Sequence, residues 1–180
     1  MNTSDISISA GRPTDERLPK ETAVYDLLDK LGISYMRADH PASDTMEECL
    51  AIGELLGVRI CKNLFLCNRQ KTRFYLLSMP EDKPFRTKDL SSQINSSRLS
   101  FANADDMLRL LDLTPGSVSI MGLMNDREKL VTLLLDKDIL SLEYFGCHPC
   151  INTSSLKLKT DDIIHKLLPC LGYEPVTVEL

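Results

Sequence analysis

Apolar residues recur at helical spacing in two stretches near the start of the chain. Between residues 21 and 31 apolar side chains fall three and four positions apart, and Gly32 follows as a stop. Thr45 precedes Glu48 by three positions, which is the spacing of a capping box, and the apolar face that follows ends at Gly57. Both stretches are predicted helices, and the same reading predicts further helices over residues 87–94, 104–111 and 160–168.

Short apolar runs predict the strands. Residues 64–67 and 74–77 flank a polar stretch, which is typical of a hairpin with a longer loop, and residues 33–38 and 130–135 fit strands as well. Several connections are too short for a crossover helix, so their strands must pair antiparallel. We therefore predict an α/β fold with a mixed, mostly antiparallel sheet surrounded by helices.

The domain organisation follows from length and composition. The chain has 180 residues, of which 43% are hydrophobic and 26% charged, as expected for one globular domain. Residues 1–20 are polar and contain Gly11, Pro13 and Pro19, so they are expected to form a flexible N-terminal arm before a single domain over residues 21–180.

Targeting and cysteine content point to a cytoplasmic protein. The first residues lack the apolar core of a signal peptide, and no stretch approaches the roughly 18 apolar residues of a membrane span. We therefore expect no membrane association, and we expect the six cysteines to be reduced thiols, several of them in the core.

The net charge of −5 excludes a general nucleic-acid binder. Any contact with RNA must come from a local basic patch around a pocket.

Several catalytic classes lack their signatures. Cys147, His148 and Cys150 have no second ligand pair at zinc spacing, so no metal is expected, and the Cys-x-x-Cys lies too late in the chain for a thioredoxin-type redox motif. The chain contains no phosphate-binding glycine loop and no GxSxG nucleophile elbow, and no cofactor is predicted.

Three polar segments remain, each beside an apolar strand. Lys62 enters the apolar run 61–65, where its burial would be costly unless it is paired or faces a pocket. Residues 115–126 hold two glycines around small hydroxyl residues, so backbone N–H groups could approach a ligand. Residues 146–155 crowd together a histidine, an asparagine and hydroxyl groups. Taken singly, a strand lysine is more often a solvated edge residue, a Gly/Ser loop is more often a turn, and a lone histidine is more often a structural hydrogen-bond partner than part of a functional site.

In this order, however, the segments resemble the YbaK and prolyl-tRNA synthetase editing-domain family, specifically its free-standing ProXp-ala (PrdX) members. The resemblance covers nearly the whole chain after residue 20: a helix, His40-Pro41, a second helix, Lys62-Asn63-Leu64-Phe65, the Gly-Ser-Val to Gly-Leu-x-Asn-Asp loop, and the late His-Pro-x-x-Asn-Thr stretch. It departs from the family where Ile120-Met121 replaces the common Pro-Phe, which puts the amino-acid preference in doubt.

The resemblance implies trans-editing: hydrolysis of the ester that joins a wrong amino acid to transfer RNA, with alanyl-tRNA(Pro) as the usual substrate. By the same matching, a water attacks the ester, Lys62 stabilises the developing charge, and Gly116, Ser117 and Gly122 line the site as an oxyanion hole. His148, with Asn152 beside it, would sense side-chain size. The remaining residues that the resemblance assigns to substrate binding are Asn63, Phe65, Ser119, Ile120, Met121 and Asn125. The implied partners are the tRNA acceptor end and prolyl-tRNA synthetase.

Two other classes stay open. A binding module could keep the fold and recognise aminoacyl-tRNA or a free amino acid without turnover. A structural or protein-interaction domain would show no affinity for charged tRNA, and the acidic charge favours it.

Overall fold

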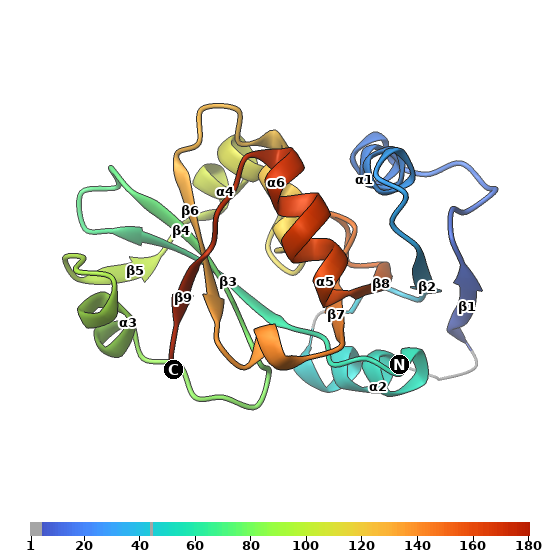
Figure 1. Ribbon diagram of the computed structural model, residues 1–180, viewed down its shortest axis with the longest axis horizontal. Helices are drawn as coiled ribbons and strands as arrows, with labels where there is room; N and C mark the ends of the chain where they lie inside the picture. Colours follow the sequence, from blue (N-terminus) through green and yellow to red (C-terminus); the bar gives the residue numbers. More distant parts are fainter. Residues whose placement is uncertain (1–4, 44) are drawn as a thin grey trace.

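The computed structural model describes residues 5–43 and 45–180, and its strands form two sheets that lie side by side with helices around them (Figure 1). The α/β class and the mostly antiparallel pairing are confirmed, although the strands divide between two sheets.

The first sheet is antiparallel throughout. Its order is β1 (Ser7–Ala10), β2 (Tyr35–Asp39), β8 (Ser154–Lys159) and β7 (Tyr144–Cys147). Helix α1 (Pro19–Lys30) packs on it through Val24, Tyr25 and Leu28, so the apolar stripe predicted from the sequence faces the core.

The second sheet is mixed. Its order is β5 (Leu99–Phe101), β3 (Lys62–Asn68), β4 (Phe74–Met79), β6 (Val131–Asp136) and β9 (Val176–Val178). Strands β5, β3 and β4 are antiparallel neighbours, which confirms the predicted hairpin, whereas β4, β6 and β9 run parallel. The parallel step from β4 to β6 is possible because α3 (Thr87–Gln93), β5 and α4 (Ala104–Leu111) supply a long connection.

Helix α2 and the last helix follow the sequence pattern closely. Helix α2 (Met46–Leu56) begins with the predicted capping box of Thr45 and Glu48, and Gly57 ends it at a φ of +65°. The last helix runs without a break through α5 (Thr160–Asp162), the π-helical η4 (Ile163–Leu167) and α6 (Leu168–Leu171), a few residues longer than predicted. None of the helices in the described ranges combines the length and apolar character needed to cross a membrane.

A tight backbone contact joins the two sheets. Ile60, just before β3, forms a bridge with Gly146 of β7, and the Cys61 N–H donates to the Gly146 carbonyl at 3.1 Å. A Cβ atom at position 146 would lie 2.6 Å from the Arg59 carbonyl oxygen, so only glycine fits at this contact. The contact brings the segments that carry Lys62 and His148 next to each other.

The N-terminal segment differs from the expected loose arm. Residues 7–10 form β1, which pairs with β2, and Arg17 lies 2.9 Å from the Asp39 carboxylate, while α1 already begins at Pro19. The sequence did not show this because β1 is short and exposed, and its pairing partners lie about thirty residues later. Residues 1–4 of the predicted arm lie outside the described residues.

Candidate active site

One pocket of about 340 Å³ gathers residues from all three polar segments. Lys62 and Asn63 come from β3, Gly116 from the loop after α4, and His148 from the turn after β7, while the start of α2 closes the pocket. The other lining residues are Ser43, Thr45, Cys49, Ile60, Cys61, Leu64 and Val118. A larger hollow of about 580 Å³ lies over β2 and β8, but none of the predicted site residues lines it.

Lys62 is half-buried, and its ammonium group is held by a loop. Its Nζ donates to the Lys83 carbonyl oxygen at 2.8 Å. The Lys83 side chain is anchored in turn, because its Nζ lies 2.6 Å from the fully buried carboxylate of Asp136 and 2.8 Å from Asp138. The 80–86 loop therefore fixes the position of the Lys62 ammonium in this conformation.

The two other predicted residues of β3 lie in different surroundings. Asn63 lines the pocket, donates to the Cys61 carbonyl at 3.2 Å and accepts a hydrogen bond from the buried Ser78 hydroxyl, which orients its amide. Phe65, which the resemblance assigns to substrate binding, instead lies in the core and stacks on Phe74 with ring centroids 5.7 Å apart. Both residues lie on the same face of β3, so their position along the strand separates them: the pocket lies at the start of β3, and farther along the strand this face packs in the core with residues of α4.

The loop after α4 reaches the pocket through Gly116. Its φ of +87° suits glycine, and the buried Ser117 hydroxyl closes the same turn by donating to the Thr114 carbonyl at 2.9 Å. Ser119 is also buried, and its hydroxyl donates to the His148 carbonyl at 2.6 Å, so it ties this loop to the histidine segment.

Two of the three expected oxyanion donors are already engaged. The Ser117 N–H donates to the Thr114 carbonyl at 3.0 Å, and the Gly122 N–H donates to the Ser119 carbonyl at 3.1 Å. Gly122 serves packing instead, because a Cβ there would lie 2.6 Å from Leu113 Cδ1. Of the three predicted residues, only Gly116 lines the pocket.

The other predicted residues of this loop lie away from the pocket. Ile120 and Met121 are fully buried in the main core, so they can shape the site only by packing behind it. Asn125 donates to the Leu111 carbonyl at 2.9 Å and lines a separate hollow beside Asp126. The sequence could not separate these residues from the pocket, because small and apolar residues alternate along the whole loop.

His148 lies at the buried end of the pocket. Its Nδ1 is 2.9 Å from the Ser154 carbonyl oxygen, which can only accept, so the neutral ring carries its proton on Nδ1 and its lone pair on Nε2. Burial lowers the pKa of His148 despite that hydrogen bond, and the ring is therefore neutral near pH 7. Asn152 lies nearby without lining the pocket, and its carbonyl accepts from the Ser43 N–H at 3.0 Å.

The structure adds His40 to this group of residues. Its ring lies 6.3 Å from that of His148, its Nδ1 is 2.8 Å from the Pro41 carbonyl, and its Nε2 is 3.0 Å from the Ser155 hydroxyl, which also lies 3.4 Å from His148 Nδ1. Burial lowers the pKa of His40 as well. The His40-Pro41 pair was visible in the sequence, but its contact with Ser155 joins positions 115 residues apart.

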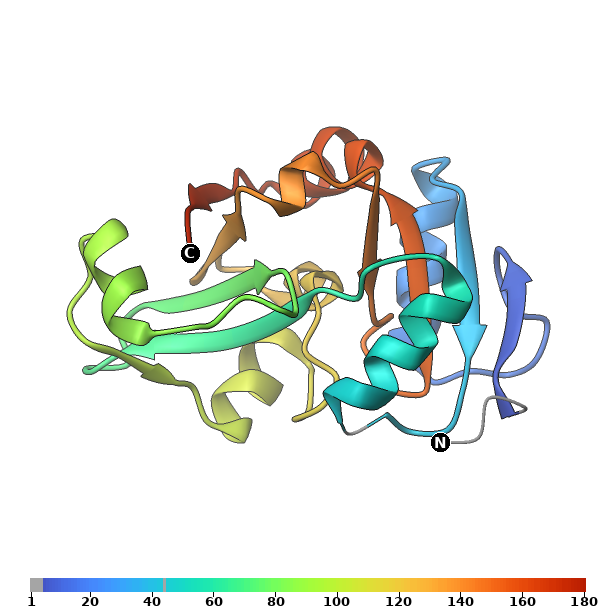
Figure 2. The same cartoon turned by 90° about the horizontal axis from the view of Figure 1, so that it is seen from below.

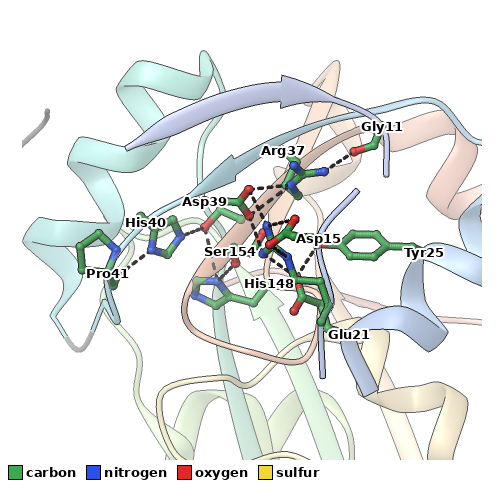
Figure 3. A network of polar contacts seen from close by, with 12 residues as sticks. Gly11, Asp15, Glu21, Tyr25, Arg37, Asp39, His40, Pro41, His148 and Ser154 are labelled. Atoms are coloured by element: carbon green, nitrogen blue, oxygen red, sulfur yellow. Dashed lines mark hydrogen bonds and ion pairs between the residues drawn. The ribbon is translucent and has the colours of Figure 1, made fainter. Parts of the chain in front are cut away.

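A charged network lies behind the histidines (Figure 3). Asp39 accepts from Arg37 at 3.0 Å and from Arg17 at 2.9 Å, and although burial opposes it, these hydrogen bonds hold the pKa of Asp39 below its usual value. Arg37 also donates to the Gly11 carbonyl at 2.6 Å, and Arg17 contacts the buried Glu21, whose pKa burial raises. The network fastens the N-terminal segment beside β2 and next to His40.

The cysteines around the site are structural. Cys61, Cys147 and Cys150 are buried free thiols, and burial raises the pKa of each, to about 12 for Cys61 and Cys150. A protonated buried thiol is a poor nucleophile, so these residues act as small core residues.

Comparison with known proteins identifies the family of the chain. The family model described as the aminoacyl-tRNA editing domain matches residues 40–166. The prolyl-tRNA editing protein ProX of Acetoanaerobium sticklandii is 32% identical over 158 residues, which cover 88% of this chain and 96% of that protein. The prolyl-tRNA synthetase associated domain-containing protein 1 of Danio rerio is 29% identical over 167 residues, 91% of this chain and 88% of that protein.

A solved structure shows the same fold. A protein described as a proposed trans-editing enzyme for prolyl-tRNA synthetase superposes with a TM-score of 0.67 at 15% identity, covering 92% of this chain and 99% of that one. The chain therefore belongs to the family of aminoacyl-tRNA editing domains.

Proposed function

We propose that this chain is a trans-editing deacylase that hydrolyses the ester between a mischarged amino acid and the terminal ribose of tRNA, with alanyl-tRNA(Pro) as substrate. The observation that carries the proposal is the meeting of Lys62, Gly116 and His148 in one pocket of about 340 Å³. The similarity to a protein named prolyl-tRNA editing protein ProX supports the choice of tRNA(Pro). The proposed editing domain comprises residues 21–180, and the preceding segment adds β1 to its first sheet and the first two residues to α1.

In this mechanism Lys62 supplies the positive charge. When the substrate enters, the Lys62 ammonium group gives up or shares its hydrogen bond to the Lys83 carbonyl and binds the ester and the terminal phosphate of the tRNA. The cation then stabilises the negative charge that develops on the carbonyl oxygen as water attacks. The ribose hydroxyl next to the ester accepts a hydrogen bond from that water and relays its proton to the departing ribose oxygen as the acyl C–O bond breaks. The products are the free amino acid and uncharged tRNA, so no covalent nucleophile is needed.

The neutral His148 and the apolar wall select the amino acid. Ile60, Leu64 and Val118 line the pocket, so a methyl side chain can be buried there. The aminoacylation site of a synthetase, shaped for proline, cannot strongly reject the smaller alanine. A second, editing pocket that excludes proline by size can separate the two amino acids. His148 lies at the buried end of this pocket, where its ring limits the space for a larger side chain.

The substrate implies the partners and the place of action. The acceptor end of tRNA is the bound partner, and prolyl-tRNA synthetase is the enzyme whose errors are corrected. Because charged tRNA is made and used in the cytoplasm, we propose that compartment.

A second candidate is a binding module without turnover. The engaged N–H groups of Ser117 and Gly122 favour it, since in this conformation neither can bind an oxyanion. Such a module would bind aminoacyl-tRNA and leave its ester intact.

The decisive experiment measures hydrolysis of alanyl-, seryl-, cysteinyl- and prolyl-tRNA(Pro) by the purified protein. Lys62→Ala is expected to remove most turnover, and Lys159→Ala, which removes an exposed lysine outside the pocket, is the matched control. Binding of charged tRNA without hydrolysis would support the binding module, and Lys62-independent hydrolysis would remove Lys62 from the mechanism.

A further inference from the structure

A hollow of about 460 Å³ lies at the end of β3 opposite to Lys62, and two arginines line it. Arg69 follows the last residue of β3 and Arg98 precedes the first residue of β5. Asn68 pairs with Leu99 in the antiparallel ladder, so the next position outward places Arg69 opposite Arg98. Ser100 also lines the hollow, through the same edge strand.

The two guanidinium groups lack counterions. Both side chains are exposed, and across residues 5–43 and 45–180 neither has an ion-pair or hydrogen-bond partner. Their neighbours differ, because Lys71 and Arg109 both pair with Asp106, at 2.8 and 3.1 Å. Two like charges held side by side repel each other, and a bound anion relieves that repulsion.

This end of the molecule is basic in an acidic protein. Segments 68–73 and 96–109 hold five arginines and lysines against two aspartates, whereas the whole chain has a net charge of −5. The net charge of the chain therefore repels RNA as a whole, whereas these segments attract it.

The distance between this hollow and the Lys62 pocket is one that a single RNA strand can span. Lys62 and Asn68 are six positions apart on β3, a span of about 20 Å, which equals about six nucleotides of a stacked strand. The Ser100 Oγ lies 3.7 Å from the Cys67 Sγ, so the two side chains share one face of the second sheet. Helix α4 and the chain that leads from it to Gly116 lie on the same side of that sheet (Figure 2).

We propose that Arg69 and Arg98 bind backbone phosphates of the tRNA whose 3′ end occupies the Lys62 pocket, an inference that rests on the proposed function. Guanidinium groups suit this role because they bind phosphate oxygens in a bidentate manner without reading sequence. The surface adds affinity for the body of the tRNA and takes no part in the cleavage of the ester.

The test compares two substrates that carry the same aminoacyl ester: full-length alanyl-tRNA(Pro) and a short single-stranded oligonucleotide with the same 3′ end. For Arg69→Ala/Arg98→Ala we expect KM for the full-length substrate to rise about tenfold at low salt, with the short substrate unaffected. The slope of log affinity against log salt should become shallower by between about one and two. Lys30→Ala/Arg127→Ala, which removes the same charge from exposed residues elsewhere, is the matched control and should change neither value.

An equal loss on both substrates would overturn the proposal, because the arginines would then act through the fold or the pocket. An unchanged KM, or the same loss in the control, would overturn it too. If the unmutated protein hydrolyses neither substrate, the proposed function fails separately, and binding of uncharged tRNA over a salt series decides the matter. A shallower slope for Arg69→Ala/Arg98→Ala then supports the surface, and an unchanged slope overturns it.

Discussion

Replacing Gly146 by alanine puts a methyl group at the point where the two sheets touch. The new Cβ would lie 2.6 Å from the Arg59 carbonyl oxygen, 2.9 Å from Ile60 Cδ1 and 3.0 Å from Ile60 Cα. Two of these three atoms belong to the backbone, so the strands must separate. Overpacking of this kind costs about 1–3 kcal/mol, and weakening the Cys61 to Gly146 hydrogen bond adds about 1 kcal/mol. We expect a loss of about 2–4 kcal/mol in the free energy of unfolding.

The activity of Gly146→Ala should fall by more than the loss of folded protein accounts for. The contact aligns the segments that carry Lys62 and His148, so moving them apart misplaces the two sides of the pocket. Urea denaturation measures the first effect, and kcat/KM for alanyl-tRNA, taken where the variant is fully folded, measures the second. A tenfold or greater loss is expected, corresponding to about 1.4 kcal/mol of transition-state stabilisation.

A second substitution identifies the source of the strain. Ile60→Val removes Cδ1 but leaves both backbone contacts, so Gly146→Ala/Ile60→Val should recover little stability relative to the two single variants. Full recovery would show that the side chain alone creates the clash. A Gly146→Ala protein that loses less than about 0.5 kcal/mol would refute the reasoning altogether.

Three further outcomes follow from the hydrogen bonds of the site. Lys83→Met should cost about 2 kcal/mol of stability and lower kcat, because the buried Asp136 loses its cation and the loop that holds Lys62 loosens. Lys83→Arg, which keeps the charge, should retain much of the stability and of kcat. Unfolding curves and steady-state kinetics measure the two effects. Ser119→Ala should cost about 1–3 kcal/mol in urea denaturation by leaving the His148 carbonyl unpaired, and an unchanged midpoint would contradict that contact. Burial lowers the pKa of His40 and His148, so on acidification the unfolded chain takes up protons before the folded one, and the free energy of unfolding should fall as the pH drops below about 6.5. A free energy of unfolding that stays constant between about pH 7.5 and 5.5 would rule this out. His165→Gln, which removes an exposed imidazole, is the control.

Most helices and the central hairpin were predictable because their signals are local. The capping box at Thr45, the stop at Gly57 and the helix over residues 104–111 depend on residues within one or two turns of one another. Strands β1, β5 and β9 were missed because each is short and pairs with a strand far away in the chain, and β7 and β8 were not predicted either. The order of the strands within each sheet and the division into two sheets are long-range properties of the same kind.

Residue chemistry by itself determined that this chain forms an α/β domain, and the order of its motifs pointed to the editing-domain family. Which of the candidate residues share a pocket was decided by tertiary structure alone. Lys62, Gly116 and His148 meet because a backbone contact at Gly146 joins the two sheets, whereas Phe65, Met121 and Asn125 turn toward the core or a separate hollow. The physical reason is that a residue faces the pocket or the core according to packing partners many residues distant in the chain, and the local pattern does not encode those partners.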